Sequence, residues 1–503
     1  MSVVKRRQFL RSGLAAIPAT LLPYGRLFAA SEVADFNDLE AVTGDRKEII
    51  LKAADVKDFA ARLRGDLLLR ESAGYDVARR VWNASFDRYP ALIARCTGAA
   101  DVVEAVNFAA AYQLLLSVRG GGHSLSGQSS CDKGLVIDLS QMNGVRVDPA
   151  RRIATVEGGA LLGALDRESL ALGLATTAGT VSHTGVGGLT LGGGFGRLAR
   201  RFGLACDNLR AVDVVTASGK FLGASNQQDQ DLFWGLRGGG GNFGVATSFE
   251  FQLHPVDPVM LGGNLMYSFE DAPAVLEFFF DFALRAPDEL NADIAVVRLP
   301  NDTRFVQIEL CYSGSVAEGE KVIAPLRQIR KPIADHVAPQ PYVKLQTTQD
   351  ESLAHGRRYY LKAGFVQKVT PGYIDAMIGV IANANLPLVQ ALSMPHGGGA
   401  IKRIKPQATA FAQRAADTNA ILFTFWDDPA MKEPVANWIR GAWAKIEPHT
   451  HGFYVNEYNP DDEARLRTTY GVNFERMVEL KTKFDPNNLF RLNANVAPKA
   501  RSS

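Results

Sequence analysis

The chain has 503 residues, of which 47% are hydrophobic and 21% are charged. This composition is ordinary for a soluble globular protein, and the length predicts two or three domains. The chain has 55 basic and 53 acidic residues, and its net charge of +2 gives no electrostatic reason to expect a nucleic acid or an anionic membrane as a partner.

The N-terminus carries the first motif. Arg6 and Arg7 are followed by Phe-Leu and then by a mildly apolar run, residues 13–22. This order is typical of a twin-arginine export signal, which a receptor reads, and the run is far shorter than the roughly 20 apolar residues of a membrane-spanning helix. The alternative is simply a basic N-terminus. We expect residues 1–30 to be a signal segment, the Tat machinery to be a partner, and the protein to be periplasmic or extracellular without stable membrane insertion.

The next residues, 31–81, are rich in charge and carry only short helical patterns, so we interpret them as a linker and capping segment. From about residue 82 the pattern alternates between strand and helix. We expect strands at 89–94, 114–118, 135–139, 153–156 and 210–216, and helices at 101–112 and 161–172.

Glycine gathers in three clusters, at residues 119–127, 179–203 and 235–244. Glycine is used where a chain turns sharply or approaches a ligand closely. We therefore expect several loops, among them the Gly185–Gly196 loop, to converge on one extended ligand. The third cluster contains a formal G-x-G-x-x-G, but a helical pattern precedes it and a strand pattern follows it, which is the reverse of the Rossmann order.

The first cluster is the most informative: Arg119-Gly120-Gly121-Gly122-His123-Ser124. Consecutive glycines let backbone N–H groups point into one concavity, which suits a pyrophosphate, and an arginine can add charge-assisted contacts. A lone histidine is normally a core or surface residue. Three glycines are a poor way to build a core, so we expect His123 to lie beside a ligand.

No metal site is expected. The four cysteines form no CxxC pair, and no His/Cys cluster has metal-ligand spacing along the chain.

After residue 255 the composition becomes ordinary and predicts a second α+β domain. We expect helices at 272–284, 316–329, 372–384 and 431–446, with strands such as 421–425 between them. The tail is polar and rich in tyrosine.

Several segments together resemble a known family. RGGGHS, GLVIDLSQMNGVRVD, GGLTLGGGFGRLARRFGLACDNL and DLFWGLRGGGGNFGVATSFEFQLHP resemble the p-cresol-methylhydroxylase-type (PCMH-type) FAD-binding domain of the vanillyl-alcohol-oxidase superfamily. YVNEY and FERMVELKTKFDPNNLFRLNANVAP resemble the C-terminal region of berberine-bridge-like and 6-hydroxynicotine-oxidase-like enzymes. The resemblance covers about residues 82–500, with the motifs in the family's order.

The resemblance implies an α+β fold in which a two-part FAD-binding domain encloses a substrate domain with an antiparallel sheet. The boundaries are a PCMH-type domain at 86–257, a substrate domain at 259–453 and a berberine-bridge-like segment at 454–503 that returns to the FAD domain.

The resemblance also implies the site. His123 would be bonded to the flavin 8α carbon. Many relatives have a second bond from a cysteine where this chain has Val181, so the linkage would be single. The other cofactor-binding residues would be Arg119, Gly120, Gly121, Gly122, Ser124, Gly179, Gly185, Gly187, Gly188, Gly192, Gly193, Gly194, Gly196, Asp207, Asn208, Gly244, Val245 and Asn456.

Tyr454 is the candidate catalytic base, and it would need a neighbouring cation or hydrogen-bond donors because a free phenol has a pKa near 10. The alternative is a core tyrosine, in which case Tyr359 and Tyr360 would be the next candidates. His183 could contact the substrate or lie on the surface. Thr184 stands where relatives usually have an aliphatic residue facing the flavin, so the access of oxygen to the flavin, and with it oxidase or dehydrogenase behaviour, stays open.

The function that follows is oxidation of an alcohol or amine-type small molecule by hydride transfer to the flavin, which O₂ reoxidises with release of H₂O₂. Two alternatives remain: a dehydrogenase of the same family that uses a quinone or another carrier, and a non-catalytic flavoprotein that binds a small ligand. The substrate is not readable from the sequence, because fold does not determine function.

Overall fold

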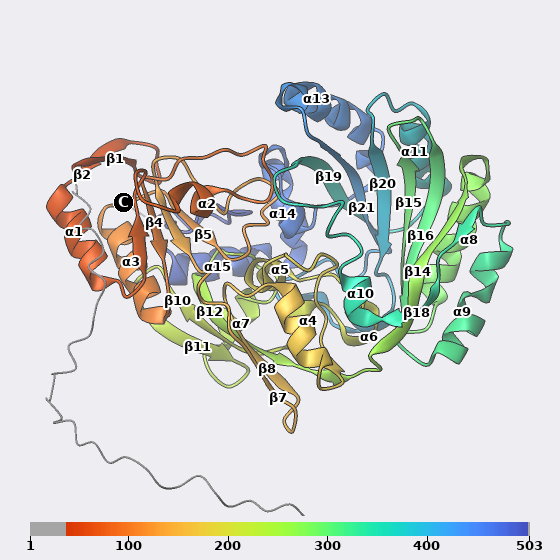
Figure 1. The fold of residues 1–503 in the computed structure, drawn as a ribbon, viewed down its shortest axis with the longest axis horizontal. Coiled ribbons are helices and arrows are strands. Elements are labelled where there is room, and N and C mark those ends of the chain that lie inside the picture. Colours follow the sequence, from red (N-terminus) through yellow and green to blue (C-terminus); the bar gives the residue numbers. More distant parts are fainter. Residues whose placement is uncertain (1–36, 501–503) are drawn as a thin grey trace, which may run out of the picture. The chain divides into compact units, whose positions relative to one another are not determined.

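The computed structural model describes residues 37–500, so the expected export signal at residues 1–30 lies outside the described part. Two layered regions make up this part: one is built on a four-stranded and a five-stranded sheet with the C-terminal tail, the other on a single large sheet (Figure 1). This mixed α+β arrangement confirms the predicted fold class.

The region with the tail is the one expected to bind FAD, and the first sheet of this FAD-binding region has four strands in the order β3-β4-β6-β5. β4 (Leu92–Arg95) and β5 (Leu116–Arg119) both pair parallel with β6 (Leu135–Asp138). Helix α3 (Ala99–Ala111) makes the crossover that two parallel strands require. β6 is buried along its whole length, as expected for a parallel strand covered on both faces.

The segment expected to be a linker and cap is part of this region. β3 (Asp66–Leu68) pairs antiparallel with β4, and the backbone N–H of Val42 donates to the carbonyl of Lys133 at 2.8 Å. The segment also contains β1 (Leu39–Val42), β2 (Glu48–Leu51), α1 (Ala53–Arg62) and α2 (Tyr75–Arg79). The high charge of this stretch hid its strands, because edge strands expose one side to solvent.

The second sheet is antiparallel, in the order β11-β10-β12-β8-β7. Its strands are β7 (Val145–Asp148), β8 (Ile153–Glu157), β10 (Leu209–Val215), β11 (Phe221–Ser225) and β12 (Val245–Gln252). Helices α4 (Leu162–Leu170) and α7 (Gln230–Gly235) pack beside it.

The stretch from Gly185 to Gly196, expected to be a loop, contains a short helix, α5 (Val186–Gly192). Glycine disfavours a helix locally, but tertiary contacts override that preference here, since Val186 and Leu191 are buried in the core.

The other region, the expected substrate region, is built on one large antiparallel sheet, with strand order β17-β14-β16-β15-β20-β21-β19 and β18 paired to β14. Its strands are β14 (Val259–Ser268), β15 (Leu290–Arg298), β16 (Arg304–Tyr312), β17 (Ala334–Asp335), β18 (Ala338–Pro341), β19 (Arg358–Val366), β20 (Val389–Pro395) and β21 (Thr418–Trp426).

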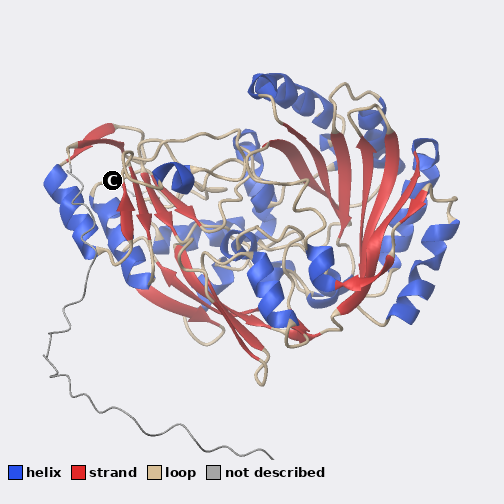
Figure 2. Ribbon diagram, viewed as in Figure 1, coloured by secondary structure: helices blue, strands red, loops and turns tan. Residues whose placement is uncertain are grey.

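Helices cover one face of this sheet: α8 (Ala272–Arg285), α9 (Val316–Gln328), α11 (Pro371–Ala382) and α13 (Lys432–Trp443) (Figure 2). Ile294, Ile308 and Leu422 point into this helix-covered core. Because side chains alternate along a strand, the residues between them point the other way. That opposite face includes Tyr359, which stacks on Trp82 of the FAD-binding region at 3.8 Å between ring centroids.

Short elements complete the connections: β9 (Leu174–Ala175), β13 (His254–Pro255), α6 (Ala199–Phe202), α10 (Tyr342–Gln346), α12 (Gly399–Arg403) and α14 (Leu466–Tyr470). Across residues 37–500, no helix combines the length and the apolar character that a bilayer crossing needs.

The tail returns to the FAD-binding region through helix α15 (Phe474–Phe484). Lys481 is fully buried there, and its Nζ donates to the carbonyls of Asn242 (3.0 Å) and Phe490 (2.7 Å) and to Oδ2 of Asp485 (2.7 Å). One buried cation therefore ties the tail to the third glycine cluster.

A second buried ion pair joins the two regions. Arg414, beside β21, donates to both carboxylate oxygens of Asp207 at 2.6 and 2.7 Å, with both side chains almost fully buried. Such a bidentate pair fixes orientation as well as distance.

Candidate cofactor and active site

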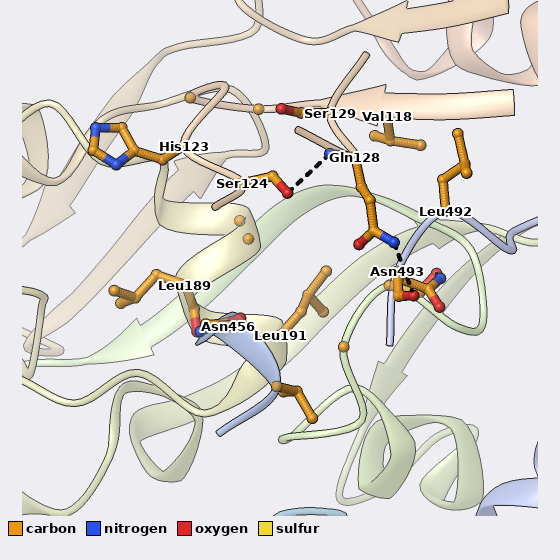
Figure 3. Close-up of a pocket in the computed structure, with 18 of the residues that line it drawn as sticks. Val118, His123, Ser124, Gln128, Ser129, Leu189, Leu191, Asn456, Leu492 and Asn493 are labelled. Carbon is orange, nitrogen blue, oxygen red and sulfur yellow. Dashed lines mark hydrogen bonds between the residues drawn. The ribbon is translucent and has the colours of Figure 1, made fainter. Parts of the chain in front are cut away.

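A cavity lies where the glycine clusters, the tail and the substrate sheet meet, and Figure 3 shows residues that line it. Its volume is about 420 Å³, within the range of small-molecule and cofactor sites. All three glycine clusters contribute to its wall: Gly120, Gly121, Gly122, Gly185, Gly187, Gly188, Gly240, Gly241 and Gly244.

Two of these glycines are required by a close backbone approach. A Cβ atom on Gly121 would lie 2.3 Å from the backbone nitrogen of Gly185, and a Cβ on Gly185 would lie 2.3 Å from that of Gly121. The first and second clusters therefore touch backbone to backbone, which no other residue type permits.

His123 lies at one end of this wall, stacked on Trp82 at 4.6 Å between centroids. Its Nε2 lies 2.7 Å from Nδ1 of His183, and its Nδ1 lies 3.4 Å from the Thr184 hydroxyl. Burial, and then the nearby His183 and His355, hold the pKa of His123 well below its usual value. The imidazole is therefore neutral at physiological pH and keeps a lone pair.

His355 completes a trio, since ligand nitrogens of His123, His183 and His355 all lie within 4.8 Å of one another. The 2.7 Å separation in the first pair is a hydrogen bond. Two nitrogens bound to one tetrahedral metal would lie about 3.3 Å apart, as expected from metal–nitrogen bonds of about 2.0–2.1 Å. His123 and His183 are therefore hydrogen-bonded to each other, and the three rings lie tilted or edge-on to one another.

Tyr454 and Asn456 line the same cavity. Asn456 belongs to the 3-10 helix η6 (Val455–Glu457), and Tyr454 is the residue before this helix. The Tyr454 hydroxyl accepts hydrogen bonds from the Gly194 backbone N–H (2.8 Å) and from Asn456 Nδ2 (2.7 Å). Asn456 Nδ2 also donates to the Leu189 carbonyl at 2.9 Å. Burial nevertheless raises the pKa of Tyr454 above its usual value.

Glu457 follows directly and also lines the cavity. Its Oε2 accepts a hydrogen bond from Asn419 Nδ2 of β21 at 2.9 Å. Burial raises the pKa of this carboxyl to about 8, although the Asn419 contact lowers it in part.

The chain matches two family descriptions, an FAD binding domain over residues 90–225 and a berberine and berberine-like segment over residues 453–497. An FAD-linked oxidoreductase of Dictyostelium discoideum is 32% identical over 88% of this chain and 97% of that protein. This chain belongs to the berberine-bridge-like FAD-linked oxidoreductases.

Other members of the family are similar over most of their length. A chitooligosaccharide oxidase of Gibberella zeae is 29% identical over 82% of this chain and 88% of its own. The crystal structure of 6-hydroxy-D-nicotine oxidase from Arthrobacter nicotinovorans superposes with a TM-score of 0.80, at 27% identity, covering 87% of this chain and 98% of that one. The predicted family, the FAD cofactor and the oxidoreductase class are confirmed.

The cavity suits the FAD of this family. Within residues 37–500, no lysine or arginine lines it. Glycine N–H groups are therefore the donors available to a diphosphate, as in other backbone anion sites. Apolar side chains and the amides of Gln128 and Asn493 line the far end; Gln128 Nε2 donates to the Asn493 carbonyl at 3.2 Å (Figure 3).

Eleven of the residues predicted to bind the cofactor line this cavity, and the predicted base Tyr454 lines it too. The eleven are Gly120, Gly121, Gly122, His123, Ser124, Gly185, Gly187, Gly188, Gly244, Val245 and Asn456.

The remaining predicted residues lie outside the lining. The guanidinium of Arg119 donates to the Ala78 carbonyl, turned away from the cavity. Asp207 pairs with Arg414, and Asn208 contacts Nε2 of His254 at 2.7 Å through its Oδ1. The glycines Gly179, Gly192, Gly193, Gly194 and Gly196 lie behind the wall, where Gly194 supplies the N–H to Tyr454.

Sequence reasoning missed three kinds of residue. Glu457 is the first of these, and a carboxylate directly after Tyr454 and Asn456 in YVNEY is a usable signal. Trp82 and His355 had no local signal, because they reach His123 only through the fold. The apolar lining of the far end, Leu116, Val118, Leu139 and Leu492, looks in sequence like any core.

Proposed function

We propose that the protein oxidises an alcohol or amine-type small molecule and binds its FAD covalently through His123. One observation carries this proposal: a single cavity joins the glycine clusters, His123 and the Tyr454–Asn456 pair. Bound FAD would supply the redox chemistry: it would accept hydride from the substrate and pass two electrons to O₂, which with two protons gives H₂O₂.

His123 supports the covalent bond because it is neutral, lines the cavity and is held in place by Trp82 and His183. A single bond is proposed, since the position of the second attachment in relatives is occupied here by Val181, a buried side chain without a nucleophile.

Tyr454 is proposed to contact the reacting O–H or N–H group of the substrate. Both lone pairs of its phenol oxygen already accept hydrogen bonds, from Gly194 and Asn456. A neutral Tyr454 can therefore donate its proton but can accept one only after ionising. Those two donors favour ionisation and burial opposes it, so the role of Tyr454 as the catalytic base stays a prediction.

The test is an anaerobic screen of alcohols, amines and oligosaccharides against the yellow protein, following the loss of flavin absorbance. We expect bleaching by at least one compound, recovery of colour in air, and one H₂O₂ per substrate. Slow recovery in air together with fast turnover on a quinone or dye would instead identify a dehydrogenase. Tight binding of ligands without any bleaching would identify a non-catalytic flavoprotein.

We also propose that the protein is exported in folded form with its FAD bound, to the periplasm or the exterior. The Arg6-Arg7 pair and the short apolar run after it support this proposal.

A further inference from the structure

Glu457 has an unusual position for a carboxyl group. It lines the cavity between the FAD-binding wall and the substrate sheet, immediately after Tyr454 and Asn456. Asn419 alone hydrogen-bonds its carboxylate oxygens in the described part of the chain, and Glu457 forms no ion pair there. Glu457 is half-buried, and a carboxyl shielded from water without a cation is held mainly as the neutral acid.

The surrounding elements offer no compensating charge. Helix α5 and strand β21 carry no titratable side chain, and β19 is the other element packed on η6. Every titratable group of β19 has a partner of its own: Arg358 with the Asp427 carbonyl, Tyr359 with the Ala354 carbonyl, Tyr360 with Asp461 and Lys362 with Asp462. On the segment of Glu457 itself, Tyr454 is engaged with Gly194 and Asn456, and Tyr458 is a half-buried phenol.

This environment gives Glu457 the property that a general base needs. A base works best when its pKa lies near the operating pH, and burial raises the pKa of Glu457 to about 8. The pKa of Tyr454 lies farther from the operating pH, because burial and the Glu457 charge both raise it.

The sheet face beside Glu457 is apolar. Strand pairing places Ile421 and Phe423 on the same face as Asn419, next to Leu361 and Leu392 of the neighbouring strands. Leu361 lines the cavity, and Leu392 and Phe423 are only partly buried. A substrate lying there would present an apolar body to the sheet and its polar group to Glu457.

We propose that Glu457 accepts the proton that leaves the substrate, and that the substrate is an apolar molecule whose reacting alcohol or amine group is neutral or cationic. This inference rests on the proposed function. The O–H or N–H bond breaks and its proton passes to the Glu457 carboxylate. The C–H bond breaks with its electron pair, which leaves as hydride to the FAD, and a C=O or C=N bond forms. Anionic substrates are disfavoured, because they would face the carboxylate in a site without a cation.

The experiment compares Glu457→Gln with Tyr454→Phe, using Glu463→Gln as a matched control, since Glu463 is an exposed acid of the same segment. Gln keeps the shape and can still accept the bond from Asn419. The first measurement needs no substrate: thermal unfolding of the purified protein at about pH 5 and about pH 9.

The expected sign follows from the raised pKa of Glu457. Its folded-state value lies above the unfolded one, so the stability that the neutral acid contributes is present at low pH and is lost as pH rises through about 8. Glu457→Gln should therefore gain thermal stability relative to wild type at about pH 9 but not at about pH 5, while Glu463→Gln should follow wild type at both. An equal difference at the two pH values would mean that Glu457 does not titrate in this range, and would overturn the proposal.

The second measurement is the anaerobic rate of flavin reduction against pH, with the substrate that the screen returns. The rate of flavin reduction in wild type should increase as pH rises. In Glu457→Gln this rate should be lower by about 10²–10⁴-fold and should not change with pH, and Glu457→Asp should regain part of it. Tyr454→Phe should keep the increase of the rate with pH. Loss of that increase in Tyr454→Phe and its retention in Glu457→Gln would assign the proton to Tyr454 instead. If wild type held no FAD or no compound bleached it, the proposed function would fail, whereas the unfolding measurement would still report on Glu457.

Discussion

Nε2 of His123 lies 2.7 Å from Nδ1 of His183, so one nitrogen of the imidazole is already hydrogen-bonded. The other, Nδ1, has only the longer 3.4 Å contact with Thr184. His123 is neutral because burial lowers its pKa. When Nε2 donates the proton of the bond to His183, Nδ1 keeps the lone pair that a bond to the flavin needs.

The first prediction follows from this pair. Acid-precipitated wild-type protein should stay yellow, and His123→Ala should release its flavin on precipitation. His355→Ala, which removes an exposed member of the same trio, should keep the colour. Flavin that stays attached in His123→Ala would show that another residue forms the bond.

The second prediction concerns the approach of Asn456 to Gly192. A Cβ atom on Gly192 would lie 2.0 Å from Oδ1 of Asn456. Gly192→Ala should displace Asn456 and remove one hydrogen-bond donor from the Tyr454 oxygen. A buried polar group that loses its partner lowers the free energy of unfolding by about 1–3 kcal/mol. The measurements are the melting temperature and the rate of flavin reduction.

Gly441→Ala is the control for that variant. Gly441 lies in helix α13, where an added Cβ meets open space, so alanine should leave stability unchanged or raise it by up to about 1 kcal/mol. Equal behaviour of the two variants would show that the Gly192 contact does not constrain Asn456.

The third prediction tests the attachment of the tail. Lys481→Met leaves Asp485 buried without its cation and also removes donors to the carbonyls of Asn242 and Phe490. Breaking a buried ion pair from one side typically costs about 3–5 kcal/mol, so denaturant unfolding should shift clearly to lower concentration.

Lys483→Met changes the same residue type in the same helix, but Lys483 is largely exposed. Its effect should stay within about 0.5 kcal/mol. If the two variants unfolded alike, the Lys481–Asp485 pair would not be what holds the tail to the FAD-binding region.

The fourth prediction concerns export. Replacing Arg6 and Arg7 together by lysine should keep the folded, flavin-loaded protein in the cytoplasm of a host that has the twin-arginine pathway. Cell fractionation and flavin fluorescence measure the outcome, with Lys47 and Arg46 exchanged for each other as a control outside the signal. Undiminished delivery of the double-lysine protein would refute the export signal.

The sequence by itself determined the family, the cofactor and the fold class. Gly120–Gly122, Gly185 and Gly244 could be recognised because close backbone approach leaves glycine as the only choice, and that requirement is written into the local sequence. The order of these clusters along the chain, with YVNEY after the substrate region, then specified the two-part domain.

Only the tertiary structure decided how the chemical groups meet. Arg119 belongs to the glycine motif, yet its side chain turns out to Ala78. Burial raises the pKa of Glu457 although Asn419 donates a hydrogen bond to it, and the strand that carries Asn419 is not near Glu457 in sequence. Backbone requirements can be read from neighbouring residues in the sequence. Burial and pairing depend instead on segments far apart in sequence, such as Gly194 and Tyr454, which are 260 residues apart and meet only through packing.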